Sequence, residues 1–159
     1  MTASIRQAVR SDAERLDAAL AALAGDLGDP YRATPAGLER AGWGRAPAFR
    51  AQIAEAGTDL AGLALYSPGL STVMGGPGLY VSDLWVAPGH RSDGLGQRLL
   101  AAAFADAAHV WGACFLRLQV YDRSPAARRF YDRLGFVPST GHTDLFLDEA
   151  GCAALKGET

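Results

Sequence analysis

The sequence predicts an α/β protein, more fully α+β, in which a mixed sheet carries helices on both of its faces. Strand-like and helix-like segments follow one another in the order strand, helix, helix, three strands, helix, strand, helix and two strands. The 159 residues, of which 49% are hydrophobic and 20% charged, suffice to bury one core. We therefore expect a single domain over residues 1–159.

The first part of the chain predicts a short strand and two helices. Residues 5–9 are expected to form the strand. Leucines then recur at helical spacing, which predicts an amphipathic helix over 12–25 with Ser11 as its N-cap. Thr34 followed by Pro35 marks the start of a second helix, because proline is well tolerated at the first helical position.

The rest of the chain supplies the other strands and two more helices. Apolar runs predict the strands, and a glycine- and proline-rich segment over 67–78 predicts a loop between two of them. A helix is expected over 94–110, and another begins at Ser124-Pro125 and ends near Leu134. The expected strands are 49–54, 60–66, 79–86, 114–120, 136–137 and 143–147.

Charge, hydropathy and cysteine content exclude several classes of function. The net charge of −2 argues against a nucleic-acid-binding protein, which usually has a basic face. No apolar run approaches the ~20 residues that cross a membrane, and the opening residues lack the apolar core of a signal peptide. Cys114 and Cys152 lack metal-ligand spacing, so we expect no metal and a reducing, cytoplasmic location.

The segment Arg91-Ser92-Asp93-Gly94-Leu95-Gly96 lies between an expected strand and an expected helix. Its glycines allow positive φ and close approach of a ligand to the backbone. The free amides of the following first helical turn favour an anion, and Arg91 can add a cation. A phosphate-binding turn is one interpretation, and a glycine-bearing loop that opens a helix without any ligand is the other.

Two segments resemble motifs that occur together in one superfamily. Residues 86–96 resemble the acetyl-coenzyme A (acetyl-CoA) loop of the GNAT N-acyltransferases, whose core is Arg/Gln-x-x-Gly-x-Gly/Ala. Residues 124–136 resemble the last helix of that superfamily, Asn-x-x-Ala-x-x-Phe-Tyr-x-x-x-Gly-Phe. Residues 34–44 and 62–84 further resemble the diamine branch, the spermidine/spermine and thialysine acetyltransferases.

The resemblance implies the GNAT fold and an acetyl-CoA site. It implies a mostly antiparallel sheet of about seven strands that splays between the fourth and fifth strands. Backbone amides of the loop would hold the pyrophosphate, and the free edge of the 79–86 strand would pair with pantetheine. The implied acetyl-CoA-binding residues are Leu84, Trp85, Val86, Arg91, Ser92, Asp93, Gly94, Leu95, Gly96, Gln97, Ser124, Ala127, Phe130 and Tyr131.

Tyr131 and Asp83 are the candidate catalytic residues. By resemblance, the Tyr131 hydroxyl protonates the leaving thiolate, and a phenol is protonated at neutral pH. The alternative is an aromatic residue that packs on the core. Asp83 is a carboxylate inside an apolar strand, which is costly without a partner. It serves as a base, as a group that holds water or as a contact for the substrate ammonium; the alternative is a structural hydrogen bond to a loop.

Substrate contacts are expected at Asp29, Tyr31, Glu55, Ser82 and Asp83, with a surface role as the alternative for Glu55. Two positions depart from the resemblance. The diamine branch often has glutamate where Ser82 stands, which puts a polyamine acceptor in doubt. The last helix motif usually begins with asparagine where Ser124 stands, and serine can still cap a helix.

These features predict an acetyl-CoA-dependent N-acetyltransferase that acts on a primary amine of a small molecule in a ternary complex. The resemblance to the diamine branch also implies a homodimer. Two other functions remain open at this point. One is acetylation of a peptide or protein N-terminus, and the other is a non-catalytic acyl-CoA-binding module.

Overall fold

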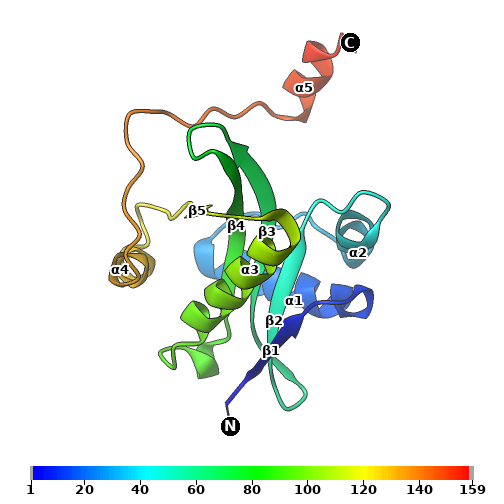
Figure 1. Ribbon diagram of the computed structural model, residues 1–159. Helices are drawn as coiled ribbons and strands as arrows, with labels where there is room; N and C mark the ends of the chain where they lie inside the picture. Colours follow the sequence, from blue (N-terminus) through cyan, green and yellow to red (C-terminus); the bar gives the residue numbers. More distant parts are fainter. Residues whose placement is uncertain (1, 158–159) are drawn as a thin grey trace. The chain divides into compact units, whose positions relative to one another are not determined.

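The computed structural model describes residues 2–157, and the chain forms two compact units, residues 1–120 and 121–159. The first unit contains a sheet of five strands (Figure 1). They follow the chain in the order β1-β2-β3-β4-β5. Their bounds are Ser4–Gln7, Arg50–Ala56, Asp59–Ser71, Gly76–Val86 and Leu116–Leu118. The mixed sheet confirms the predicted fold class.

The sheet opens between its fourth and fifth strands, as predicted. Neighbouring strands β1 to β4 pair antiparallel, whereas β5 pairs parallel with β4 over Leu79–Val81 only. Among the described residues, the last five residues of β4, 82–86, therefore have no strand partner on their β5 side. This leaves a free backbone edge beside the turn that follows β4.

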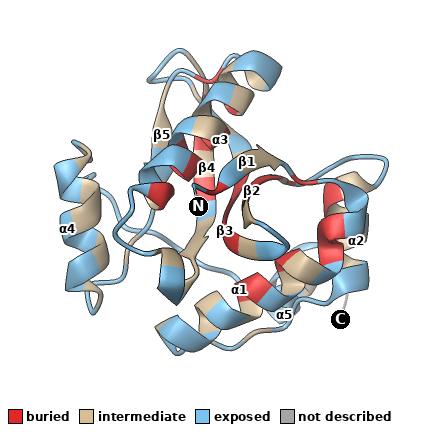
Figure 2. Cartoon of the chain, turned by 90° about the horizontal axis from the view of Figure 1, so that it is seen from below, coloured by how far each residue is buried: buried red, intermediate tan, exposed pale blue. Residues whose placement is uncertain are grey.

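Helices cover both faces of the sheet because side chains alternate along β3. Leu63 and Leu65 pack in a core cluster with α1 (Ala13–Leu27) and α2 (Pro35–Trp43). Tyr66 points to the other face, where its ring contacts Trp111 of α3 (Leu95–Trp111) edge to face. Figure 2 shows the buried residues concentrated on β3 and on the inner sides of these helices.

The start of α1 differs from the prediction. A short 3₁₀ turn, Arg10–Asp12, precedes the helix, and Asp12 rather than Ser11 occupies the N-cap position. The Asp12 carboxylate accepts the Val9 amide at 2.8 Å and is also bound by Arg6 at 2.8 Å, a contact that the helical spacing of leucines does not indicate. The predicted cap of α2 is confirmed, since Thr34 Oγ1 accepts the Gly37 amide at 3.1 Å.

The segment 67–78, predicted as a loop, is mostly strand. It extends β3 and β4 into a long hairpin that turns at residues 72–75, where the Gly75 amide donates to the Ser71 carbonyl at 2.9 Å. Glycine and proline suggested a loop, but Gly78 has a packing role. A Cβ at Gly78 would overlap the Phe115 ring, so glycine lets this ring lie against β4. The expected 114–120 strand narrows to the three residues of β5.

The second unit contains α4 (Pro125–Arg133) and α5 (Glu149–Leu155). The two strands predicted at 136–137 and 143–147 are wrong, since these residues have no strand structure in the described chain. A strand needs a neighbouring strand, and a short apolar run does not specify one. α5 was not predicted; the Asp148 carboxylate caps it by accepting the Gly151 amide at 2.8 Å. No helix within residues 2–157 has the length and apolarity required of a membrane span.

Candidate functional site

The turn after β4 has the geometry of an anion-binding loop. Ser92 and Gly94 both adopt left-handed φ values, 73° and 71°. Gly94 is the N-cap of α3, and glycine has no side chain with which to cap the first helical turn. The amides of Leu95, Gly96 and Gln97 thus begin a seventeen-residue helix without a side-chain cap, where backbone dipoles favour negative charge.

Arg91 holds this turn in place. Its Nε donates to the Val86 carbonyl at 2.9 Å, and its Nη2 donates to Asp26 of α1 at 2.7 Å. The side chain is half exposed. Leu95, by contrast, is buried, so that only its backbone can face a ligand. A polar hollow of about 350 Å³ beside the turn is lined in part by His90, Asp93 and Arg98.

The free edge of β4 includes Leu84, Trp85 and Val86. Their other edge pairs with Ala64, Leu63 and Gly62 of β3, so the strand is fixed on one side only. The Trp85 ring packs against the core cluster beneath α1 and α2. Its buried indole N–H has no hydrogen-bond partner among the described residues.

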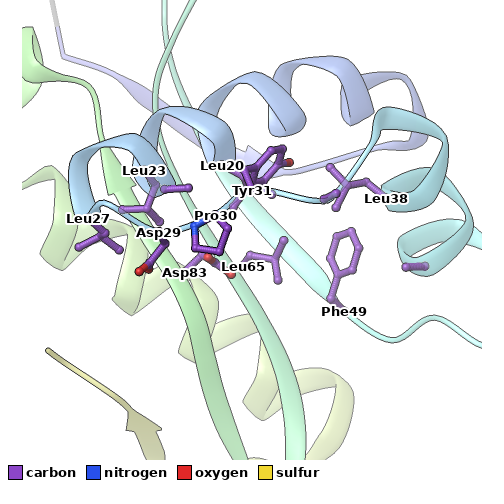
Figure 3. Close-up of a pocket in the computed structure, with 13 residues that line it drawn as sticks. Leu20, Leu23, Leu27, Asp29, Pro30, Tyr31, Leu38, Phe49, Leu65 and Asp83 are labelled. Atoms are coloured by element: carbon purple, nitrogen blue, oxygen red, sulfur yellow. The ribbon is translucent and has the colours of Figure 1, made fainter. Parts of the chain in front are cut away.

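A pocket of about 360 Å³ lies between the two N-terminal helices and the sheet (Figure 3). Thirteen residues line it, and only three of them are polar: Asp29, Tyr31 and Asp83. The apolar wall includes Leu20, Leu23, Leu27, Leu38, Phe49 and Leu65. The structure therefore brings together three of the five predicted substrate contacts.

Asp83 reaches this pocket from β4, two residues before the Trp85–Val86 edge. Its carboxylate accepts a hydrogen bond of 2.7 Å from Ser82 Oγ. Ser82 does not line the pocket itself. The serine that replaces the glutamate expected from the diamine branch thus supports the orientation of Asp83 instead of adding a second charge.

Tyr31 adds a protonated hydroxyl to the pocket. The hydroxyl donates to Asp17 of α1 at 2.9 Å. Burial raises the pKa of this phenol first, and the negative charges of Asp17 and Asp83 raise it further. Since its proton faces Asp17, the oxygen can accept a hydrogen bond from a ligand in the pocket.

Glu55 is not brought to this pocket. Its carboxylate accepts from Arg6 at 2.9 Å and from Arg15 at 2.7 Å. Arg6 also forms two bonds with buried Asp12, so these residues make one ionic network joining β1, β2 and the start of α1. These bonds, with that to Arg6 first, lower the pKa of Glu55. Glu55 is thus engaged in this ionic network, outside the pocket that holds Asp29, Tyr31 and Asp83.

The second unit presents the remaining predicted residues on α4. Ser124 is the N-cap residue, but its side chain makes no capping bond. The rings of Phe130 and Tyr131 lie 5.1 Å apart, and the Tyr131 ring lies 5.4 Å from that of Phe136. Burial raises the pKa of Tyr131, so its hydroxyl carries a proton at neutral pH. Ala127 lies on the same helix.

The apolar wall of the pocket was missed from the sequence. Leu23 and Leu27 lie on the helical stripe that predicted α1, and nothing in that periodicity separates a residue facing a pocket from one packed in the core. Asp17, which orients Tyr31, was also missed. Among residues 2–157, no group of three or more acidic, histidine or cysteine side chains is arranged to hold a metal ion.

A split β4–β5 edge followed by an uncapped helical turn is the arrangement that the sequence motifs led us to expect. Residues 16–136 match the sequence profile of the Acetyltransferase (GNAT) family, and the chain belongs to this family. Its enzymes transfer acetyl groups from acetyl-CoA. A search of curated proteins finds no match.

Solved structures share the fold at low sequence identity. An integron cassette protein from the mobile metagenome of V. cholerae is 18% identical, with a TM-score of 0.79 over 98% of both chains. An aminoglycoside acetyltransferase from an uncultured soil metagenomic sample is 20% identical, with a TM-score of 0.74 over 93% of this chain and 100% of that one. A ribosomal-protein-alanine N-acetyltransferase from Brucella melitensis biovar Abortus 2308 is 21% identical, with a TM-score of 0.74 over 91% and 99%. At such identities the likeness establishes the fold alone.

Proposed function

We propose that the protein is an acetyl-CoA-dependent N-acetyltransferase that acetylates a primary amine of a small molecule by direct attack in a ternary complex. One observation carries the proposal. Asp83 projects from β4 into a bounded pocket, and the same strand continues through its free edge to the turn at Arg91–Gly96. A single strand thus links an amine-binding pocket to an anion-binding turn.

The donor half of the site consists of the turn and the free strand edge. The amides of residues 92–97 hold the pyrophosphate of acetyl-CoA, since the left-handed residues and the helix start concentrate positive potential there. Leu84, Trp85 and Val86 offer backbone groups to the pantetheine arm, as an edge strand does to an added strand. By resemblance, Ser124, Ala127 and Phe130 of α4 also contact acetyl-CoA.

The chemistry requires a neutral amine and a protonated leaving group. Asp83 accepts the proton that the amine must lose. The amine nitrogen then forms a bond to the thioester carbon, and the carbon–sulfur bond breaks. Tyr131 donates a proton to the departing thiolate, and its raised pKa is consistent with this acid role. Most of the acceleration comes from holding the two reactants together.

The test is release of free thiol from acetyl-CoA in the presence of an amine panel. We expect Tyr131→Phe to lower kcat by about 100-fold or more while the affinity for coenzyme A is preserved. Tyr80→Phe is the matched control, because this hydroxyl donates to the exposed Gln119 side chain at 3.3 Å and has no place in the proposed site. No thiol release with any member of a panel of apolar monoamines, diamines, amino acids, amino sugars and peptides would refute the proposal.

The same assay separates the two alternatives. An N-terminal peptide acceptor requires an open groove, whereas the acceptor pocket is bounded by two helices and the sheet, which favours a small amine. A non-catalytic acyl-CoA-binding module predicts tight coenzyme binding without turnover. It further predicts that Tyr131→Phe alters affinity alone.

The proposal includes a homodimer in the cytoplasm, as the resemblance to the diamine branch implies. Light scattering on the purified chain tests the dimer, whose expected mass is twice 16.7 kDa. A diamine acceptor belongs to the same resemblance, but serine at position 82 removes a carboxylate that would favour it.

A further inference from the structure

The acceptor pocket has an uneven distribution of polarity. In Figure 3 the carboxylates of Asp29 and Asp83 lie near each other, between Leu27 and Leu65, whereas Leu38 and Phe49 lie on the far side of Leu65. Ten of the thirteen lining residues are apolar, and none of the thirteen is basic. A ligand that fills this space meets negative charge at one end and hydrocarbon elsewhere.

The polar end suits a single cationic or amine nitrogen. Asp29 and Asp83 provide carboxylate oxygens there, whereas the Tyr31 hydroxyl, whose proton is directed to Asp17, lies apart from them in Figure 3. The negative charge of Asp83 acts on the Tyr31 phenol, so these two groups lie within electrostatic range of each other. Two carboxylates in a pocket without a basic lining residue attract an amine and repel a second carboxylate. This argues against amino acids as substrates that receive the acetyl group.

The size and the wall of the pocket limit the rest of the ligand. Its volume of about 360 Å³ corresponds to about twelve water molecules at the ~30 Å³ that each occupies in the liquid. A second ammonium group, or the many hydroxyls of an amino sugar, would lie against leucine and phenylalanine side chains that offer no hydrogen bond. Buried polar groups left unpaired in this way strongly disfavour a ligand.

We infer that the acceptor is a primary monoamine with an apolar body of about ten non-hydrogen atoms, an arylalkylamine or a branched alkylamine. This inference rests on the proposed function. The amine group lies at the Asp83 end, where the acetyl group is received, and the apolar body extends along α1 toward Phe49. The pocket thus selects against diamines as well as amino sugars.

The first experiment compares 2-phenylethylamine and 3-methylbutylamine with putrescine, spermidine and kanamycin as acceptors of acetyl-CoA. We expect kcat/KM for the monoamines to exceed that for each polar amine by at least 10-fold. Calorimetry of 2-phenylethylamine with the protein alone measures binding independently of transfer. Its neutral isostere 2-phenylethanol is expected to bind at least 10-fold more weakly, because it lacks the cation that the carboxylates attract.

A matched pair of variants tests the apolar wall. Leu23→Gln places an amide in the pocket on a partly exposed helical face, and Leu70→Gln makes the same change at the exposed end of the hairpin. We expect Leu23→Gln to lower kcat/KM for 2-phenylethylamine about 10-fold and that for putrescine less than twofold. Leu70→Gln is expected to change neither, and thermal unfolding shows whether each variant remains folded.

The outcomes separate this inference from the proposed function. Transfer to putrescine or kanamycin with kcat/KM equal to or above that of the monoamines overturns the inference and leaves acetyl transfer intact. Binding of 2-phenylethylamine that Asp83→Asn weakens, without any acetyl transfer, supports the inference and refutes the proposed function. Absence of both binding and transfer overturns both.

Discussion

Replacing Asp106 by alanine tests how α3 is anchored to the sheet. The Asp106 carboxylate accepts Arg50 Nε at 2.6 Å, Arg50 Nη2 at 2.8 Å and the Tyr66 hydroxyl at 2.6 Å. Tyr66 is fully buried, and its oxygen also accepts from Gln52 at 3.0 Å. One carboxylate on the helix therefore holds two strands.

The structure sets the size of the expected effect. Alanine leaves the buried Tyr66 hydroxyl without its acceptor, which costs about 1–3 kcal/mol. Arg50 loses its ion pair, but its side chain is 26% exposed and water compensates in part, so that this loss adds about 1 kcal/mol. We expect Asp106→Ala to lower the free energy of unfolding by about 2–4 kcal/mol.

Urea denaturation measures this change, provided that the m-value is unaltered. The double variant Tyr66→Phe/Asp106→Ala has no buried hydroxyl left without an acceptor. Its loss in free energy of unfolding should therefore be about 1 kcal/mol smaller than the sum of the losses in the two single variants. Asp59→Ala, at an exposed carboxylate, serves as the control and should change stability by less than about 0.5 kcal/mol. A double-variant loss that equals the sum of the two single losses to within about 0.5 kcal/mol would refute the coupling between Tyr66 and Asp106.

Three further predictions concern glycine positions and charge. Gly94→Ala should lower the free energy of unfolding by about 1 kcal/mol and weaken coenzyme A binding, because the backbone φ of 71° strains alanine even though no atom lies within 4 Å of the added Cβ. Gly89→Ala is the control, since Gly89 is equally open and has no positive φ, and it should change neither unfolding in urea nor coenzyme A binding. Gly62→Ala should lower the free energy of unfolding by about 1–3 kcal/mol, since its Cβ would lie 2.8 Å from the Trp85 carbonyl oxygen; unchanged urea stability would contradict this packing. Arg6→Ala should cost about 1–2 kcal/mol at pH 7. The hydrogen bond from Arg6 lowers the pKa of Asp12 in the folded protein, so this stabilisation is present above the ordinary carboxyl pKa of about 4 and is lost as the pH falls from there through the lowered pKa. The free energies of unfolding of the two proteins, measured in urea, should therefore approach each other as the pH is lowered below about 4.

The sequence predicted elements whose signals are local. Thr34-Pro35 started α2 as expected, because a cap and a first-turn proline act within four residues. The segment 67–78 was misjudged because its glycines and prolines suggested a loop, whereas pairing along the hairpin and the Phe115 ring determine its structure. The strand predicted at 143–147 failed for the converse reason, since its alternation specified no partner.

The candidate site divides in a similar way. Asp83 was identifiable as a charge inside an apolar strand, and with Asp29 and Tyr31 it lines one pocket. The sequence could not show that Glu55 lies outside this pocket, because Arg6, which binds its carboxylate, lies 49 residues earlier in the chain. The pocket wall was hidden for a physical reason: leucines that face a ligand and leucines that face a core share the same periodicity.

The pocket has a consequence for how acceptor specificity can diverge. Ten of its thirteen lining residues fall between Leu20 and Ala41, one continuous stretch that ends well before the turn at Arg91–Gly96. Substitutions that reshape the acceptor wall therefore need not disturb the donor loop. Under the proposed function, substitutions at the lining residues of segment 20–41 redirect the choice of amine, and Asp26 has to be kept because it binds Arg91 of the donor turn.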